Sequence, residues 1–376
     1  MQIQIFNNRR VRYSLAVSLL ALVFLSGVEN TTARSKAPNP TTMRGARCLQ
    51  LVDHRQYAPI SLKGKLAVTF VEQSIDEESQ GDPHEIGVFD LTKPEIPVRR
   101  LTNNLVNEAE VDISPDGKKL VYTLRPKLDG FEHNSEFWEM NMDGSNPVKL
   151  LSGKPYAGPT YFQPDGKKLL FTEISMSEEE GHKLYILDGT TKAVTKFPTN
   201  LENIGDPEIS YDGRLVVFKM AIETDRDYQP SLYVMNADGS NVRRLTTGYS
   251  DHDAVFSRDN KKLYFERYYG PGDWFEASQD RSKPEHNMWG IVEVDIATKR
   301  EKIIVPHDPC GLHLFWLPTV SPDGKSVMYV HNDVTSSVTG QEQDQPWSDL
   351  WVAEINGQNP QKVPGSDWFY FFDWAE

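Results

Sequence analysis

A repeated strand–turn–strand pattern restricts the fold of this chain more than any other feature. In each copy an alternating apolar run leads into a tight turn and a second such run follows, as in Val111–Tyr122, whose turn reads Ser-Pro-Asp-Gly. Asp-Gly turns between runs of period two are typical of β-hairpins. The first turn position recurs roughly every 50 residues, with a longer last interval, at Ser114, Gln163, Ser210, Ser257 and Ser321. Hairpin-rich repeats of this length predict the blades of a β-propeller.

Each repeat continues into a second hairpin. Phe137–Leu151 and Leu232–Leu245 both place Asp-Gly-Ser-Asn between two apolar runs. Two hairpins make the four strands of one blade. The longer last interval contains the Gly-, Pro- and charge-rich segment Tyr268–Asn287, which we interpret as an insertion between second and third strands.

A sixth blade is expected to combine the two ends of the chain. Leu62–Phe70 looks like a second strand that lacks its first, and Ile86–Leu91 with Val98–Leu101 supply the third and fourth. The apolar run Trp368–Trp374 is the candidate innermost strand, whose pairing would remove an exposed sheet edge. Docking of this run elsewhere on the surface is the alternative. The sequence therefore predicts an all-β fold, a six-bladed antiparallel β-propeller over 60–376, closed by pairing of N- and C-terminal strands.

The motifs resemble one propeller family. Ser-Pro-Asp-Gly-Lys before an apolar strand (Ser114–Lys118), and Asn-x-Asp-Gly-Ser-Asn before a strand ending in Arg-Leu-Thr (Asn236–Thr246), are similar to the TolB-type repeat. The resemblance extends from about residue 60 to residue 376, with a weaker copy at Asp259-Asn260. TolB carries an α/β domain before its propeller, and prolyl-oligopeptidase relatives carry a hydrolase domain with a Gly-x-Ser-x-Gly motif. Neither is found here, so the resemblance implies a propeller alone.

The first residues read as a targeting segment. Arginines between Arg9 and Arg12 precede the apolar run Tyr13–Val28, and small residues follow. This order is typical of a secretory signal peptide, predicted at 1–33, with a linker at 34–59. An uncleaved membrane anchor is the alternative. The expected location is periplasmic or secreted.

The formal net charge of −14 limits the classes of partner. Nucleic-acid binding requires a basic surface, which this composition does not provide. Anionic membranes and polyanionic ligands are disfavoured because the long-range field is repulsive. We expect a monomer that binds a protein or a small neutral or cationic ligand, with membrane attachment only through an uncleaved anchor.

The two faces of the predicted propeller differ. The turns between first and second strands form one face, where the Asp-Gly aspartates are expected to hold the hairpins: Asp116, Asp165, Asp212 and Asp323. The opposite, long-loop face carries three acidic segments, Asp76–Glu78, Glu178–Glu180 and Asp225–Asp227. Binding residues gather on such loops, so the sequence predicts an acidic rim that meets a basic partner.

Acidic residues also recur in the predicted innermost strands. Glu110, Asp206 and Asp253 lie four positions before the first turn residue, which should place them in the central channel. Neighbouring candidates for this channel-mouth site are Glu108, Glu208, Asp251, His252 and His313. A hard divalent cation is one interpretation, with Asp251, His252 and Asp253 as candidate metal ligands. The other is that each acid accepts hydrogen bonds from an adjacent blade, and no cofactor is then expected.

Cys48 and Cys310 are the two cysteines. An exported protein permits a disulfide between them, although two unrelated cysteines are equally compatible with the sequence.

No complete catalytic constellation is visible. The function predicted is therefore a non-catalytic binding or scaffolding module for a protein or small ligand. The alternative is a hydrolase or lyase that uses acids and histidines at the channel mouth, with or without a metal, and carbohydrates are one candidate class of substrate.

Overall fold

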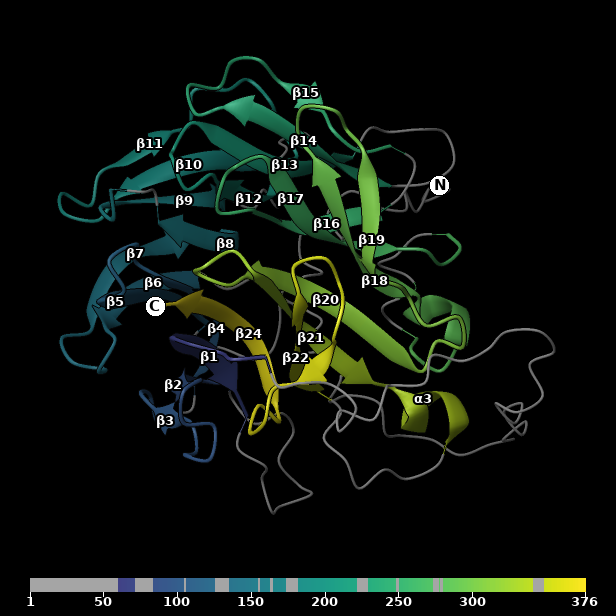
Figure 1. Cartoon of the computed structure of the whole chain (residues 1–376). Helices are drawn as coiled ribbons and strands as arrows, with labels where there is room; N and C mark the ends of the chain where they lie inside the picture. Colours follow the sequence, from purple (N-terminus) through teal and green to yellow (C-terminus); the bar gives the residue numbers. More distant parts are fainter. Residues whose placement is uncertain are drawn as a thin grey trace, which may run out of the picture.

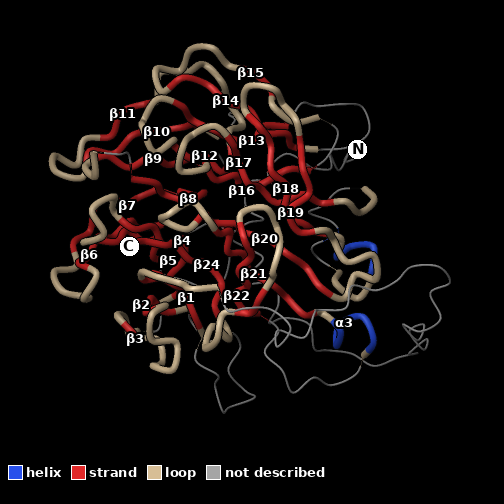
Figure 2. The backbone as a smooth tube through the Cα atoms, in the orientation of Figure 1, coloured by secondary structure: helices blue, strands red, loops and turns tan. Residues whose placement is uncertain are grey.

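The computed structural model describes most of the region predicted to fold. The described residues are 60–71, 84–104, 106–125, 135–154, 156–162, 165–173, 182–221, 229–247, 250–272, 277, 280–340 and 348–376. They form six four-stranded antiparallel sheets around a central channel (Figure 1). Strands and loops make up nearly all of this part of the chain (Figure 2). The prediction of an all-β, six-bladed propeller is confirmed.

The blades are numbered 1 to 6 in ring order. The innermost strands are β24 (Phe369–Ala375), β4 (Asn107–Ile113), β8 (Tyr156–Phe162), β12 (Gly205–Ile209), β16 (Ser250–Phe256) and β20 (His313–Val320). The second strands are β1 (Lys65–Phe70), β5 (Lys119–Arg125), β9 (Lys168–Glu173), β13 (Leu215–Ala221), β17 (Lys262–Tyr268) and β21 (Ser326–Asp333). The third strands are β2 (Glu85–Asp90), β6 (Ser135–Asn141), β10 (Lys183–Asp188), β14 (Pro230–Asn236), β18 (Trp289–Asp295) and β22 (Ser348–Glu354). The outer strands are β3 (Arg99–Arg100), β7 (Val148–Lys154), β11 (Val194–Lys196), β15 (Arg243–Arg244), β19 (Glu301–Val305) and β23 (Gln361–Lys362).

Two short helical elements lie on the loops. The 3-10 helix η5 (Pro284–Asn287) belongs to the insertion between β17 and β18, where the sequence predicts one, and α3 (Thr335–Thr339) follows β21. No helix in the described ranges is long and apolar enough to span a membrane.

The ring closes in blade 1. β24 pairs antiparallel with β1, with Trp374 opposite Leu66 and Phe372 opposite Val68, and it contacts both β20 and β4 (Figure 1). At Gly64 a Cβ would overlap the carbonyl oxygen of Ala375, and its φ of +91° suits glycine. The predicted closure is therefore confirmed, and docking of the C-terminal run elsewhere is wrong.

The apolar core lies between adjacent blades. Val217 and Val234 of blade 4 belong to one cluster with Phe265 of blade 5. A larger cluster joins blade 1 to blade 6, for example Val68 to Val330. Because both sheet faces are used for packing, the channel is where side chains of all blades can meet a ligand.

Candidate functional site

The turns between first and second strands are built as predicted. In blade 2 the Ser114 hydroxyl donates to Asp116 Oδ1 at 2.8 Å, and the same oxygen accepts from the Lys118 amide at 3.1 Å. Ser210 with Asp212 and Ser321 with Asp323 repeat the contact, at 2.7 and 2.8 Å. Asp165 accepts from the amide of Lys167 at 2.9 Å. These aspartates hold hairpins, and the turns form a ring around one end of the channel.

A cavity of about 510 Å³ occupies this end of the channel. It lies at the face of the hairpin turns, opposite the long-loop face on which the sequence placed binding. Its lining follows the repeat. One position after the first turn residue lie Pro115, Tyr211, Arg258 and Pro322. Two positions before it lie Asp112, Glu208, Val255, Thr319 and, by register with β1, Asp373. Four positions before it lie Glu110, Asp253 and Leu317.

Tyr211 and Arg258 form the part of the rim that departs from the repeat. Both stand where blades 2 and 6 carry proline. The guanidinium of Arg258 lies 4.2 Å from the centroid of the Tyr211 ring and donates to the Val320 and Ser321 carbonyls at 2.8 and 3.0 Å. Tyr211 keeps 39% of its surface exposed. An aromatic ring held by a cation at a cavity rim is a contact surface for a ligand.

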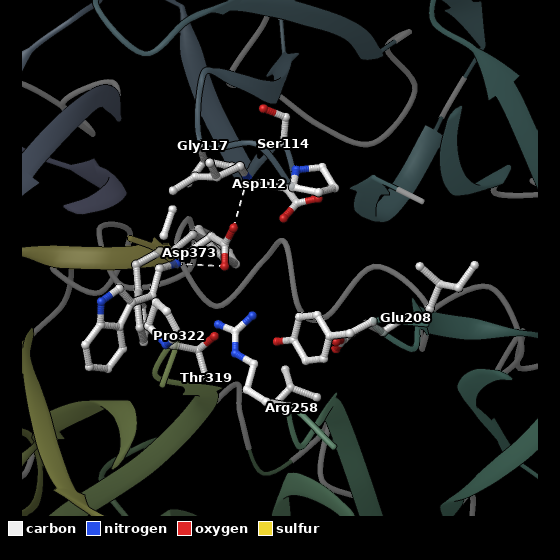
Figure 3. A pocket seen from close by; sticks show the side chains of 18 of the residues that line it. Asp112, Ser114, Gly117, Glu208, Arg258, Thr319, Pro322 and Asp373 are labelled. Carbon is white, nitrogen blue, oxygen red and sulfur yellow. Dashed lines mark hydrogen bonds between the residues drawn. The ribbon is translucent and has the colours of Figure 1, made fainter. Parts of the chain in front are cut away.

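Three carboxylates face the same space from different blades. Figure 3 shows Asp112 and Asp373 on one side of the space into which the guanidinium of Arg258 points, and Glu208 on the other side. Asp373 accepts from the Ile113 amide of the next blade at 2.8 Å, and Glu208 Oε1 accepts from Phe256 of its next blade at 3.4 Å. Burial raises the pKa of Glu208 well above its usual range. Asp373 and Glu208 thus each accept a hydrogen bond from a neighbouring blade, and Glu208 is the one of the two that the sequence selected.

The acids four positions before the turn occupy β-bulges. Glu110, Asp206 and Asp253 have φ of 53°, 45° and 45°, and Leu317 of blade 6 has 47°. The strand register shifts at each of these points. A left-handed non-glycine residue costs about 1–2 kcal/mol, and bulges of this kind redirect a side chain.

The bulge acids have different partners. Glu110 accepts from Thr123 and Arg125 at 2.8 and 2.6 Å, and Asp206 pairs with Lys219 at 2.5 Å. The carboxyl group of Asp253 instead shares a hydrogen bond with that of Glu266. Among the described bulge acids, Asp253 is therefore the one that lines the cavity and has no paired cation of its own.

Several predicted site residues lie outside the cavity. Glu108 accepts from Thr102 and Asn104, and Asp251 forms a buried ion pair with Arg267 at 2.6 Å. His252 Nδ1 lies 3.1 Å from the Lys219 ammonium. Among the described residues no three histidine, cysteine or acidic side chains are grouped to hold a metal ion. Asp251, His252 and Asp253 follow one another along β16, and their side chains have separate partners.

His313 belongs to a separate cluster. Its Nδ1 lies 3.1 Å from Nε2 of His331, whose Nδ1 contacts Asp349 at 2.8 Å. His307 stacks on Tyr269 instead. The structure thus joins His313 to His331, whereas His252, the other histidine predicted at the channel mouth, lies beside Lys219.

Other predictions concern residues that are not described. The acidic segments Asp76–Glu78, Glu178–Glu180 and Asp225–Asp227 lie outside the described ranges, as do residues 1–59. Cys310 is buried and disulfide-bonded. Cys48 lies outside the described residues, so its pairing with Cys310 stays a prediction.

Sequence reasoning missed part of the cavity. It selected Glu110, Glu208 and Asp253, which line the cavity, and omitted Tyr211 and Arg258. The signal for the latter two is the loss of proline from an otherwise regular turn.

Stability is expected to fall as pH rises through the range where Glu266 ionises. Burial raises its pKa to about 7, with Asp206 adding to the effect. The folded state therefore binds more protons than the unfolded state between the unfolded pKa of about 4.3 and the folded value. Relative to Glu266→Gln, the wild type should lose up to about 1.4 kcal/mol per pH unit in this window.

Urea unfolding of both proteins at several pH values measures this difference. Glu95→Gln, at an exposed acid, is the control and should run parallel to the wild type. If the stability of Glu266→Gln ran parallel to that of the wild type over this pH range, the raised pKa of Glu266 would be contradicted.

Solved structures share this architecture. TolB from Acinetobacter baumannii is 19% identical, with a TM-score of 0.60 over 84% of this chain and 68% of that chain. TolB from Agrobacterium tumefaciens is 16% identical, with a TM-score of 0.55 over 83% and 99%. Kuenenia stuttgartiensis hydrazine synthase is 13% identical, with a TM-score of 0.51 over 84% of this chain and 48% of that chain. No protein-family model matches the sequence. These likenesses show that the chain has the six-bladed propeller fold found in TolB.

Proposed function

We propose that this protein is a binding module that holds its ligand in the central cavity at the hairpin-turn face. The observation that carries the proposal is the substitution of the turn proline by Tyr211 and Arg258 in adjacent blades, where both line the cavity. Proline at this position is sufficient for the hairpin, as blades 2 and 6 show, so the tyrosine and arginine are explained by contact with a ligand.

The cavity also suits binding in size and composition. A volume of about 510 Å³ lies in the range of small-ligand pockets, and the lining contains both aromatic side chains and carboxyl groups. The same space would accept a side chain or terminus of a protein partner. A location outside the cytoplasm is part of this proposal and rests on the signal-like residues 1–33.

Tyr211→Ala should weaken ligand capture by about tenfold or more, because aromatic anchors at a rim contribute about 1.4 kcal/mol or more. The fold should be unaffected, since the backbone amide of Tyr211 keeps its bond to Asn260 Oδ1 at 2.9 Å. The measurement is quantitative capture from an envelope extract by immobilised wild type and variant. Val242→Ala, 40% exposed on the outer edge of blade 4, is the control.

Equal capture by wild type and Tyr211→Ala would contradict a cavity site. If charge reversal at Asp76–Glu78 and Glu178–Glu180 then abolished capture, the acidic loops would be the binding surface instead. The hydrolase or lyase alternative stays a prediction, tested by metal analysis and glycan or ester turnover of the same preparation.

A further inference from the structure

The wall of the cavity is rich in acidic side chains. Seven of the described lining residues are acidic, namely Glu110, Asp112, Asp116, Glu208, Asp253, Asp373 and Glu376, and Arg258 is the one basic residue among those described. Glu110 is paired with Arg125, which lies beside the cavity. The described part of the wall thus presents more carboxyl groups than cationic groups, which favours a ligand that carries positive charge.

Arg258 does not remove this imbalance through its hydrogen bonds. Its Nε and Nη2 donate to the main-chain carbonyls of Ser321 and Val320, and its face lies on Tyr211. The guanidinium is thereby held at the rim by the neighbouring blade. It shapes the opening of the cavity and does not donate to Oε2 of Glu208 or to Oδ2 of Asp253.

Two carboxyl oxygens in the cavity wall have no hydrogen-bond partner. They are Oε2 of Glu208 and Oδ2 of Asp253, and each residue is only 8% exposed. A buried acceptor without a donor costs about 1–3 kcal/mol. Proteins rarely retain such groups without use, and both line the same cavity, on adjacent blades. A ligand whose N–H groups donate to both oxygens would remove this cost at each of them.

We propose that the ligand of the cavity is an organic cation, an alkyl-ammonium or guanidinium group whose N–H donors bind Glu208 and Asp253. This inference rests on the proposed function and names the chemistry of its ligand. The aliphatic part of the cation lies against Tyr211 and Phe371, which line the same space. A free polyamine-like molecule and a lysine or arginine side chain of a partner protein carry this chemistry equally.

Binding of a cation is coupled to release of protons. Burial raises the pKa of both Glu208 and Asp253 well above the usual range of a carboxyl group. An adjacent positive charge favours the ionised form and lowers both pKa values. Affinity should therefore rise with pH, by up to tenfold per pH unit for each proton released.

Isothermal titration calorimetry tests the proposal with three probes of similar length. Agmatine carries two positive groups on a four-carbon chain, 1,4-butanediol is neutral, and adipate is a dianion. Titrations between about pH 6 and about pH 8, in two buffers of different ionisation enthalpy, count the protons released. Agmatine should bind with proton release, and the other two probes should not bind. A short acetylated and amidated Gly-Arg-Gly peptide distinguishes a partner's side chain from a free amine.

Glu208→Gln should weaken agmatine binding by about tenfold or more and abolish the proton that Glu208 releases. Glutamine matches the shape of protonated glutamic acid, so this variant should fold, which circular dichroism verifies. Glu202→Gln removes an exposed acid that is not among the lining residues of the cavity, and should change affinity less than twofold.

Other results would overturn the inference. These are binding of butanediol as tight as that of agmatine, binding of adipate, agmatine binding without proton release, or no agmatine binding at millimolar concentration. The proposed function is judged separately by Tyr211→Ala. If that variant loses capture while agmatine fails, the cavity binds a ligand of different chemistry; if it retains capture, the cavity is not the site.

Discussion

Arg267→Met is expected to lower the free energy of unfolding by about 3–5 kcal/mol. Arg267 contacts Asp251 through Nε and Nη2 at 2.6 and 3.0 Å, and contacts Glu301 through Nη1 at 2.6 Å. Its side chain is 5% exposed and that of Asp251 is 0% exposed. The variant leaves a carboxylate inside the protein without its cation, which is the costly half of a buried ion pair.

The size and the pH dependence of this loss are both informative. Burial already raises the pKa of Asp251, and the arginine opposes the shift. Without Arg267 the pKa should rise further, so the deficit relative to wild type should shrink as pH falls and Asp251 becomes neutral. Chemical unfolding at neutral and acidic pH measures both values.

Two further variants separate the ion pair from general damage. Asp251→Leu combined with Arg267→Met should recover most of the lost stability, because no charge is then left buried. Lys325→Met, which breaks an exposed pair with Asp323, should cost less than about 1 kcal/mol. A loss below about 1 kcal/mol for Arg267→Met would show that Asp251 is reached by water, contrary to its burial.

Phe369→Ala is expected to lower the free energy of unfolding by about 3–5 kcal/mol. The reason is that Phe369 belongs to the strand that closes the propeller. Phe369 opens β24, is 2% exposed, and makes edge-to-face contacts with Phe89 and Phe70 at centroid distances of 5.5 and 6.5 Å. Removal of this ring leaves a cavity where blade 1 meets the end of the chain.

Phe372→Ala is the matched control in the same strand. Phe372 is half-buried and lines the cavity, so its truncation should cost clearly less. Chemical unfolding measures both variants. Equal losses would indicate that β24 is held by its backbone pairing with β1 more than by the aromatic contacts.

Much of the fold was predictable because it depends on local repetition. Alternating apolar residues around Asp-Gly turns specify hairpins without reference to the rest of the chain, and the number of copies specifies the number of blades. Pairing of Trp368–Trp374 with Leu62–Phe70 was also predictable, since an apolar terminal run and a blade without its first strand complete one another.

The candidate site was predictable only in part. Glu110, Glu208 and Asp253 were found because the repeat register places them on innermost strands. The same register failed for Glu108 and Asp251, which have partners in the same blade or its connecting segment. A register gives the strand and the height of a residue, and the nearest hydrogen-bond donor or opposite charge decides where its side chain turns.

Short-range patterns in the chain were enough to predict the propeller, the hairpin role of aspartates such as Asp116, and acidic residues in the channel. The position of the cavity at the hairpin-turn face became clear only from the folded ring. The tertiary structure also decided that Tyr211 and Arg258 form the rim, and that Asp373 joins the carboxylates of the cavity wall. The physical reason is that the ring brings together residues from blades far apart in the chain, and burial and pairing in that ring set the charge of each side chain.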